Sequence, residues 1–222
     1  MQKNYNNINM ITAGHTNCYV LRGSEGDILI DTGIKKFRDH IEMWLMNYNI
    51  KLIILTHGHN DHIQNAKYFS KLYNCKIAMS AYDVNLARDN SIHKLYTFNA
   101  IGKTVLRLFK KSFEEKSEKF NVDIFLEDGM SLDTYGINAK IVSLEGHTRG
   151  SIGVLYGDDF YIGDALCNAV TPNFRYICES KKAAKKSVIK IKESGAKRLL
   201  TGHLDPICIG DNNYKKCFEK WI

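Results

Sequence analysis

The sequence is poor in proline and lacks any long apolar run, and both absences narrow the class of protein. Only two prolines occur among the 222 residues, Pro172 and Pro206, so no proline-rich linker divides the chain. The longest apolar runs, such as the one at 52–55, are far too short to span a bilayer, so a membrane partner is not expected. Hydrophobic residues make up 44% of the chain and charged residues 25%, which excludes a disordered or fibrous protein.

Paired cysteines and an export signal are also missing. The six cysteines are spread from Cys18 to Cys217 without a CxxC pair, and the polar N-terminal ten residues have no apolar segment typical of a signal peptide. We therefore expect free thiols and a cytoplasmic location. Because no repeat or change in composition divides the chain, we expect one domain over residues 1–222.

The formal net charge is +7, and much of the excess lies in Lys103–Lys119 and Lys181–Lys192. Both stretches place apolar residues between the charges at helical spacing. We interpret them as solvated helix faces, although such an excess is also compatible with an anionic partner.

Short strands and amphipathic helices occur in two groups. Strands are expected at 18–21, 27–31, 52–56, 76–79, 139–144, 152–156, 160–162 and 198–201. Helices are expected at 35–47, after residue 62, within 82–122, at 182–194 and near the C-terminus. Two groups of strands, each followed by helices, predict a layered α/β fold rather than one regular βαβ series.

Three histidines and an aspartate fall within six residues, His57-x-His59-x-Asp61-His62, directly after the strand predicted at 52–56. Residues two apart on an extended segment point the same way, so His57 and His59 can face one point, while Asp61 and His62 can face a second point nearby. Imidazole and carboxylate ligands suit Zn²⁺ and also serve Fe or Mn. The pattern predicts a metal site.

Candidate ligands also follow three further predicted strands. His147 lies in a glycine-rich turn after 139–144, Asp164 follows 160–162, and His203 follows 198–201. Each alone is weak evidence, but strand ends that all deliver His or Asp indicate ligands gathered at one edge of a sheet sandwich. His15, His40 and His93 have no such pattern and are interpreted as surface or packing residues, while Asp205 is a candidate to orient His203.

In this order, and with Asp31 in Ile-Leu-Ile-Asp-Thr-Gly, the motifs resemble those of the metallo-β-lactamase superfamily over residues 17–206. The resemblance implies a four-layer αββα sandwich with a dinuclear site at one edge. Asp31 would orient the ligand loop without binding a metal. The implied ligands are His57, His59 and His147 for the first metal, Asp61, His62 and His203 for the second, and Asp164 as the bridge between them.

Differences from several branches of the superfamily reduce the number of branches that this chain can resemble. Lactamases usually carry cysteine where this chain has Asp164, and flavodiiron proteins carry glutamate in place of His59. The RNA-processing members with an inserted domain need a longer chain, and the segment 82–122 does not resemble the arm of the tRNA 3′-end endonucleases. The glyoxalase II-like and lactonase-like hydrolases remain, although only about twenty residues follow His203, where glyoxalase II has a glutathione-binding helical domain.

The expected activity is hydrolysis of an ester, thioester or lactone carbonyl by a hydroxide that bridges two divalent metals, with Asp61 and Asp164 as catalytic residues. Zn²⁺ is the expected metal, with Fe or Mn as alternatives, and the expected partner is a small acyl or anionic substrate rather than a nucleic acid. A phosphodiesterase or ribonuclease with the same site, or a persulfide dioxygenase with one iron, remains an alternative. The sequence leaves the substrate and the oligomeric state open.

The segment at about 82–122 is interpreted as a helical insertion. Five apolar residues in it recur at helical spacing: Ile101, Val105, Leu108, Phe109 and Phe113. This helix is expected either to cap the substrate entrance or to dock on the sandwich.

Overall fold

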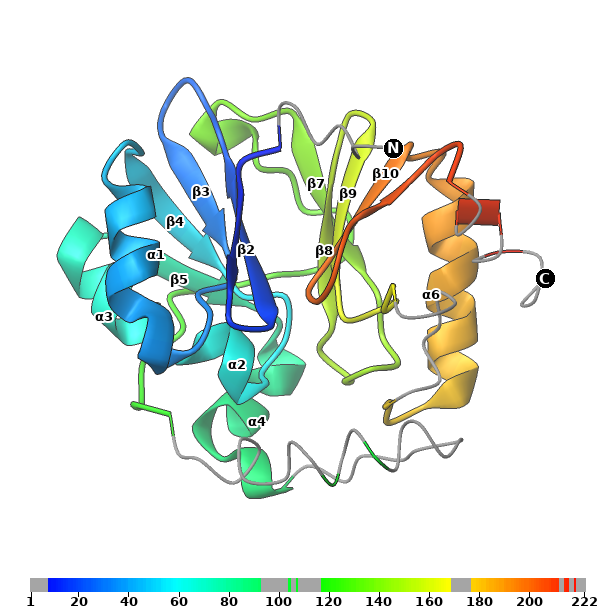
Figure 1. Cartoon of the computed structure of the whole chain (residues 1–222), viewed down its shortest axis with the longest axis horizontal. Helices are drawn as coiled ribbons and strands as arrows, with labels where there is room; N and C mark the ends of the chain where they lie inside the picture. Colours follow the sequence, from blue (N-terminus) through cyan, green and yellow to red (C-terminus); the bar gives the residue numbers. More distant parts are fainter. Residues whose placement is uncertain are drawn as a thin grey trace.

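Two β-sheets face each other and carry helices on their outer sides (Figure 1). The computed structural model describes residues 8–92, 104, 107, 117–168, 177–211, 214, 215 and 218. In Figure 1, α1 (Arg38–Leu45) and α3 (Ala66–Tyr73) lie outside the first sheet, and α6 (Lys181–Glu193) lies outside the second. This arrangement is the predicted four-layer αββα sandwich.

The first sheet has six strands, which follow one another in chain order. The first three strands pair antiparallel, and the pairs from β3 to β6 are parallel. The strands are β1 (Met10–Ala13), β2 (Thr16–Leu21), β3 (Asp27–Ile30), β4 (Ile50–Ile54), β5 (Lys76–Met79) and β6 (Ile124–Phe125).

The second sheet has five strands in the order β11-β10-β9-β8-β7. Only the β9–β10 pair is parallel. The strands are β7 (Ala139–Ser143), β8 (Ile152–Tyr156), β9 (Asp159–Gly163), β10 (Arg198–Thr201) and β11 (Ile207–Cys208). Shorter elements connect the strands: α2 (Asn60–Ile63), α4 (Val84–Arg88) and the 3₁₀ turns η1 (Lys35–Phe37), η2 (Ala81–Asp83), η3 (Asn90–Ile92) and η4 (Asp133–Tyr135).

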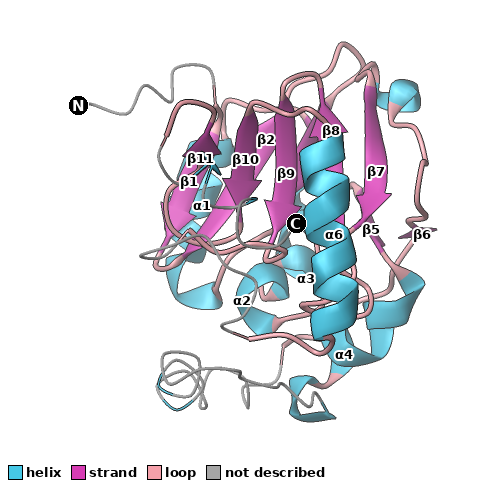
Figure 2. Cartoon of the chain, turned by 90° about the vertical axis from the view of Figure 1, so that its right-hand side faces the viewer, coloured by secondary structure: helices cyan, strands magenta, loops and turns pink. Residues whose placement is uncertain are grey.

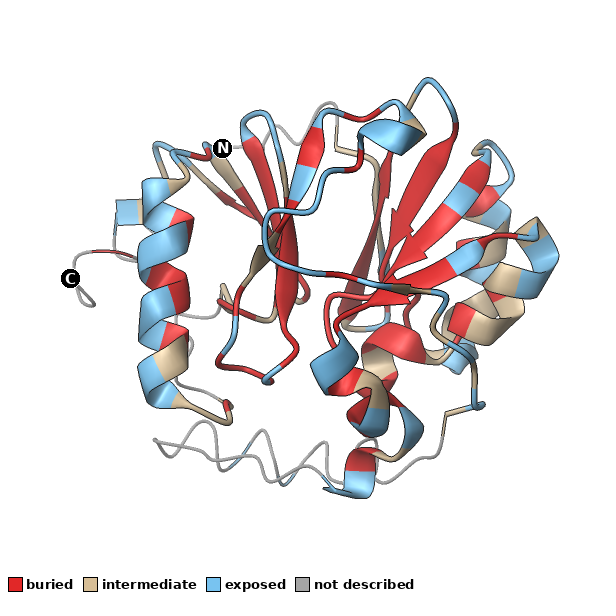
Figure 3. Cartoon of the chain, turned by 180° about the vertical axis from the view of Figure 1, so that it is seen from behind, coloured by how far each residue is buried: buried red, intermediate tan, exposed pale blue. Residues whose placement is uncertain are grey.

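The core divides into three layers, because the central strands are covered on both faces. In β3, Ile28 and Ile30 pack between the two sheets, whereas Leu29 packs toward α1 and α3. Strands buried on both faces read as continuous apolar runs, which is why 27–31 and 52–56 could be recognised in the sequence. Figure 3 shows the same pattern, with buried strands inside and exposed outer faces on the helices.

Helix α6 lies over the outer face of the second sheet (Figure 2). It packs one apolar stripe against this sheet and exposes its lysines to solvent. Ala184, Val188 and Ile191 occupy this stripe and are at most 2% exposed. The solvated lysine face predicted from the charge spacing is therefore confirmed for α6.

Some predicted boundaries differ from the structure. The strand predicted at 52–56 is Ile50–Ile54, because the Thr56 amide bonds the carboxylate of Asp31 instead of a neighbouring strand. The short strands β1, β6 and β11 were not predicted. The five apolar residues that predict a helix within 82–122 lie outside the described residues. Two residues of the helix expected near the C-terminus, Cys217 and Trp221, also lie outside them.

In the part of the chain that the structure describes, no helix combines the length and apolar character that a membrane crossing requires.

Candidate metal centre

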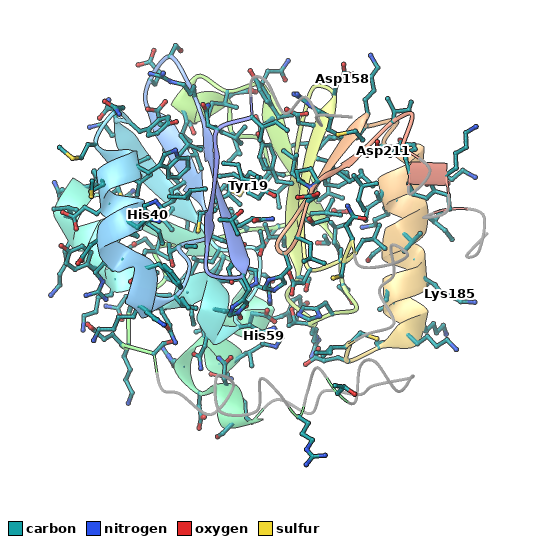
Figure 4. The ribbon with its side chains drawn as sticks, viewed as in Figure 1. Tyr19, His40, His59, Asp158, Lys185 and Asp211 are labelled. Atoms are coloured by element: carbon teal, nitrogen blue, oxygen red, sulfur yellow. The ribbon has the colours of Figure 1, made fainter. Side chains whose placement is uncertain are left out.

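The predicted ligands lie together at one edge of the sandwich, where strands from both sheets end. β4 leads into His57 and His59, and α2 carries Asp61 and His62. From the second sheet, the turn between β7 and β8 carries His147, β9 ends one residue before Asp164, and His203 follows β10. Figure 4 shows His59 beside α2 at this edge, whereas His40 lies on α1 and Lys185 projects from α6, both away from it.

Three groups of side chains in the described residues could each hold a metal ion. Within each group, the ligand atoms all lie within 4.8 Å of one another. Two of the groups coincide with the two ligand sets that the resemblance implies, and their role as ligands remains a prediction. The groups are His57, His59 and His147; Asp61, His62 and His203; and His57, His62 and Asp164.

The first group is buried and closely packed. His59 Nδ1 lies 2.9 Å from His57 Nε2 and 2.9 Å from His147 Nε2. One ring nitrogen carries at most one proton, so hydrogen bonds among these three atoms cannot satisfy all of them. A cation that accepts three lone pairs fits this arrangement of nitrogens.

The second group is more open to solvent. Asp61 Oδ2 lies 3.3 Å from His203 Nε2 and 3.6 Å from His62 Nε2. The His62 side chain is fully buried, whereas those of Asp61 and His203 are 13% and 22% exposed. Solvent therefore reaches the site from the side of Asp61 and His203.

Asp164 lies between the two groups. Its Oδ2 is 3.4 Å from His147 Nε2 and 3.2 Å from His203 Nε2. Its Oδ1 is buried without a hydrogen-bond partner in the described structure and lies 3.6 Å from His62 Nε2. Because a buried carboxylate oxygen without a hydrogen bond is costly, this atom also fits a cation.

Hydrogen bonds on the far side of four rings determine which nitrogen faces the site. His147 Nδ1 donates to the Ile177 carbonyl at 2.9 Å, and His203 Nδ1 donates to the His15 carbonyl at 2.6 Å. The Nε2 atoms of these rings are thereby left as lone-pair donors toward the centre. The sequence suggested that Asp205 orients His203. In the structure, the His15 carbonyl, in the turn between β1 and β2, accepts the hydrogen bond from His203 Nδ1 instead.

Asp31 determines the orientation of the other two rings. Its Oδ2 accepts from His62 Nδ1 at 2.7 Å and from the Thr56 hydroxyl at 2.8 Å. Because the Thr56 proton is used for this bond, Thr56 Oγ1 accepts from His57 Nδ1 at 3.0 Å. Asp31 adopts a positive φ of 59°, a conformation that Asp tolerates better than most residues. These contacts are the ones that an orienting residue needs.

Burial and charge set the protonation of the site without metal. Burial, with the neighbouring imidazoles adding to it, holds the pKa of His57 well below its ordinary value. Burial acts to lower the pKa of His62, but the carboxylates of Asp61, Asp31 and Asp164 outweigh it and raise the pKa to about 9.

The same balance applies to the exposed side of the site. Burial acts to lower the pKa of His203, but the carboxylates of Asp164 and Asp61 outweigh it and raise the pKa to about 10. In return, the imidazoles keep the pKa of both carboxylates below the ordinary value against the effect of burial. A bound cation replaces these protons, since metal ligands must be deprotonated.

Two contacts at this edge were not predicted from the sequence. Thr16 donates from Oγ1 to Asp61 Oδ2 at 3.2 Å, and His15 Nε2 lies 3.5 Å from the same oxygen. The His15 ring also stacks on His203, with centroids 5.5 Å apart. The interpretation of His15 as a surface or packing residue is therefore incomplete. No spacing rule connects residue 15 with residues 61 and 203. His40 is exposed on α1, as predicted, and His93 lies outside the described residues.

Comparison with protein families gives one match over most of the chain. The model described as "Metallo-beta-lactamase superfamily" matches residues 11–203. Hydroxyacylglutathione hydrolase GloC of Haemophilus influenzae is 29% identical over 168 residues, which are 70% of this chain and 69% of that protein. The matched segments span 54–69% of the lengths of the curated relatives.

Solved structures share the fold. The metallo-beta-lactamase family protein TTHA1429 of Thermus thermophilus has a TM-score of 0.70 and 22% identity, with 96% of this chain and 77% of that chain covered. The structure of TTHA1623 in a di-iron-bound form has a TM-score of 0.67 and 20% identity, with 90% of this chain and 93% of that chain covered.

Proposed function

The chain belongs to the metallo-beta-lactamase superfamily, and on this premise we propose that it is a metal-dependent hydrolase acting on an ester, thioester or lactone carbonyl. The observation that carries the proposal is the convergence of five histidines and two aspartates, from both sheets, on one edge of the sandwich. Catalytic metal sites need several nitrogen and oxygen ligands and an open side. The partial exposure of Asp61 and His203 supplies the open side.

The ligand sets follow the two groups of atoms. His57, His59 and His147 would hold one cation, and a second set of Asp61, His62 and His203 would hold the other. Asp164, which lies between the two groups, would contribute to both. When bound, divalent cations activate water at neutral pH and polarise a carbonyl oxygen. The imidazole-carboxylate donor set favours zinc, and iron is the alternative.

The residues of the chain have distinct parts in the reaction. The hydrogen bonds that fix the rings of His57, His62, His147 and His203 keep the donor set preorganised. Asp61 Oδ2 and Asp164 Oδ2 both face His203 Nε2, at 3.3 and 3.2 Å. Both carboxylates therefore lie at the more exposed side of the site, where they would orient a water for attack on the carbonyl carbon.

One observation supports an acyl substrate. The relative GloC is by name a hydroxyacylglutathione hydrolase, and an acyl group carried on the thiol of glutathione is a thioester. We therefore propose a hydroxyacyl thioester as the first substrate to test.

Metal content tests the site. Protein purified without chelator is expected to contain about two divalent metals per chain, mainly zinc, by elemental analysis. His203→Ala should lower this number, whereas His40→Ala, which removes an exposed histidine on α1, should leave it unchanged. One iron per chain without zinc would instead support the persulfide dioxygenase alternative.

A substrate panel tests the reaction. Thioester, aryl ester, lactone and phosphodiester substrates are compared with the wild-type protein, His203→Ala and His40→Ala. Acyl hydrolysis that His203→Ala abolishes and His40→Ala retains is the expected result. Turnover of the phosphodiester alone would contradict the acyl proposal and favour a phosphodiesterase.

A further inference from the structure

We infer that Asp83 is a positioning residue that holds the His57–His59 loop and the His147 turn at the separation that the first metal requires. The inference rests on the proposed metal site. Asp83 belongs to no motif of the sequence analysis and lies near the start of the segment interpreted there as a helical insertion. It closes the 3₁₀ turn η2, which follows β5.

The carboxylate of Asp83 joins two loops that come from different sheets. Its Oδ2 accepts from the Gly58 amide at 2.9 Å and from the Thr148 hydroxyl at 2.7 Å. Its Oδ1 accepts from the Gly150 amide at 2.7 Å. Gly58 lies between His57 and His59, and Thr148 directly follows His147. One buried side chain thus holds both segments that carry the first ligand group, the His57–His59 loop and the His147 turn.

The glycines of the two motifs are explained by this packing. A Cβ on Gly150 would lie 2.4 Å from Asp83 Oδ1, and a Cβ on Gly58 would lie 2.9 Å from the Asp83 carbonyl oxygen. No side chain fits at either position while Asp83 keeps its place. The close approach of both loops to Asp83 therefore requires the glycines in His-Gly-His and in Thr-Arg-Gly-Ser.

Asn90, seven residues further on, holds the same loop from a second point. Its Nδ2 donates to the Gly58 carbonyl at 2.9 Å, and its Oδ1 accepts from the Asn60 amide at 2.9 Å. Asn90 is 6% exposed and Asp83 is 2% exposed. The stretch from η2 to η3 therefore holds the ligand loop at two points.

The contacts of Asp83 are with backbone amides and a hydroxyl, so its effect on the rings is indirect. The two loops meet where His59 Nδ1 lies 2.9 Å from His147 Nε2. If the carboxylate is lost, at least one buried donor loses its acceptor, and the two loops lose their shared support. Residues that hydrogen-bond to the ligand rings themselves typically change metal affinity by about 10- to 100-fold, and we expect an effect of this order from the loss of the shared support.

The test compares Asp83→Asn with Asp27→Asn. The control replaces another buried carboxylate that accepts a backbone amide, at the opposite end of the first sheet. Metal affinity is measured by competition with a chromophoric chelator for Zn²⁺, and Co²⁺ absorption reports the ligand geometry. Asp83→Asn is expected to lower the affinity of the tighter site by about 10- to 100-fold and to change the Co²⁺ spectrum. Asp27→Asn should leave both unchanged.

A second variant keeps the inference testable if Asp83→Asn does not fold. Thr148→Val removes one donor to the carboxylate and should weaken metal binding, whereas Thr148→Ser keeps the hydroxyl and should restore it. Unchanged affinity and spectrum in a folded Asp83→Asn or in Thr148→Val would overturn the positioning role. A wild-type protein that binds no metal would overturn both this inference and the proposed function. Metal binding without hydrolysis of any acyl substrate would overturn only the proposed function.

Discussion

At the scale of single residues, Asp31 has the widest influence on the candidate centre. It bonds His62 directly and reaches His57 through the Thr56 hydroxyl, so one carboxylate sets two rings that belong to different ligand groups. Its unusual backbone conformation, with φ of 59°, places the carboxylate under both rings. Asp31 is not one of the predicted metal ligands. It acts by holding the Nδ1 side of the rings, so that their Nε2 atoms face the candidate centre.

Asp31→Asn tests this role, because Asn tolerates the same positive φ and has the same shape. Asn cannot accept from all three donors that Asp31 serves, so His62 or Thr56 loses its partner. We expect metal affinity to fall by about 10- to 100-fold, measured by chelator competition. The matched control is Asp27→Asn, at the other end of β3. Equal affinities for the two variants would show that Asp31 does not act on the rings.

The buried thiols give a second prediction at this scale. Burial raises the pKa of Cys75 and Cys178 to about 11. At pH 8 only about 0.1% of such a thiol is the reactive thiolate. Iodoacetamide should therefore modify both cysteines slowly in the folded protein and fully in denaturant, as read by peptide mass mapping. Rapid labelling of Cys178 under native conditions would mean that the thiol is not held in the core.

At the scale of elements, α6 stabilises the second sheet through a narrow stripe. Val188 is fully buried against this sheet, whereas its neighbour Ile189 is 39% exposed. Val188→Ala should lower the free energy of unfolding by roughly 2 kcal/mol, because it removes buried methyl groups and leaves a cavity. Ile189→Ala should change it by less than about 0.5 kcal/mol. Urea denaturation of both variants is the measurement, and similar losses would contradict the packing of α6.

The elements that sequence reasoning predicted are those with a clear periodicity or continuous apolar run. The strands β3, β5 and β8 and the helix α6 lie within about two residues of their predicted bounds. Burial of one or both faces of an element produces a recognisable pattern of apolar residues in the sequence. The edge strands β1, β6 and β11 have two to four residues, too few to show a period.

The segment that carries Asp83 and Asn90 shows a different limit. It consists of 3₁₀ turns and the five-residue helix α4, whose side chains make specific hydrogen bonds rather than a periodic apolar face. The sequence predicted a helical insertion that caps the substrate entrance or docks on the sandwich, and the structure brings the residues at its start against the ligand loops. Contacts between residues 25 and 65 positions apart have no signature in one sequence.

At the scale of the whole molecule, the candidate centre connects the two sheets. The ligand motifs could be ordered from the sequence because each follows a strand, and strand ends meet at an edge. The supporting contacts could not be predicted, since His203 donates to the His15 carbonyl and His147 to the Ile177 carbonyl. Both contacts depend on the tertiary packing of the chain, which leaves no local pattern in the sequence.

Because the centre takes its side chains from both sheets, bound metal is expected to stabilise the entire fold. A ligand present at about 1,000 times its Kd adds roughly 4 kcal/mol to the stability of the folded state. For a domain of this length, each kcal/mol raises the melting temperature by about 2–4 °C, so removal of metal should lower it by roughly 8–16 °C.

Differential scanning calorimetry before and after exhaustive chelation measures this shift, and added Zn²⁺ should restore the original value. Asp164→Ala removes the side chain that faces both ligand groups, and should therefore show a much smaller response to chelation and to Zn²⁺. His40→Ala should respond like the wild-type protein, since that residue is exposed on α1. If chelated and zinc-loaded wild-type protein melt at the same temperature, the seven side chains do not tie the two sheets together through metal. The cluster at this edge would then be held by its own hydrogen bonds and ion pairs.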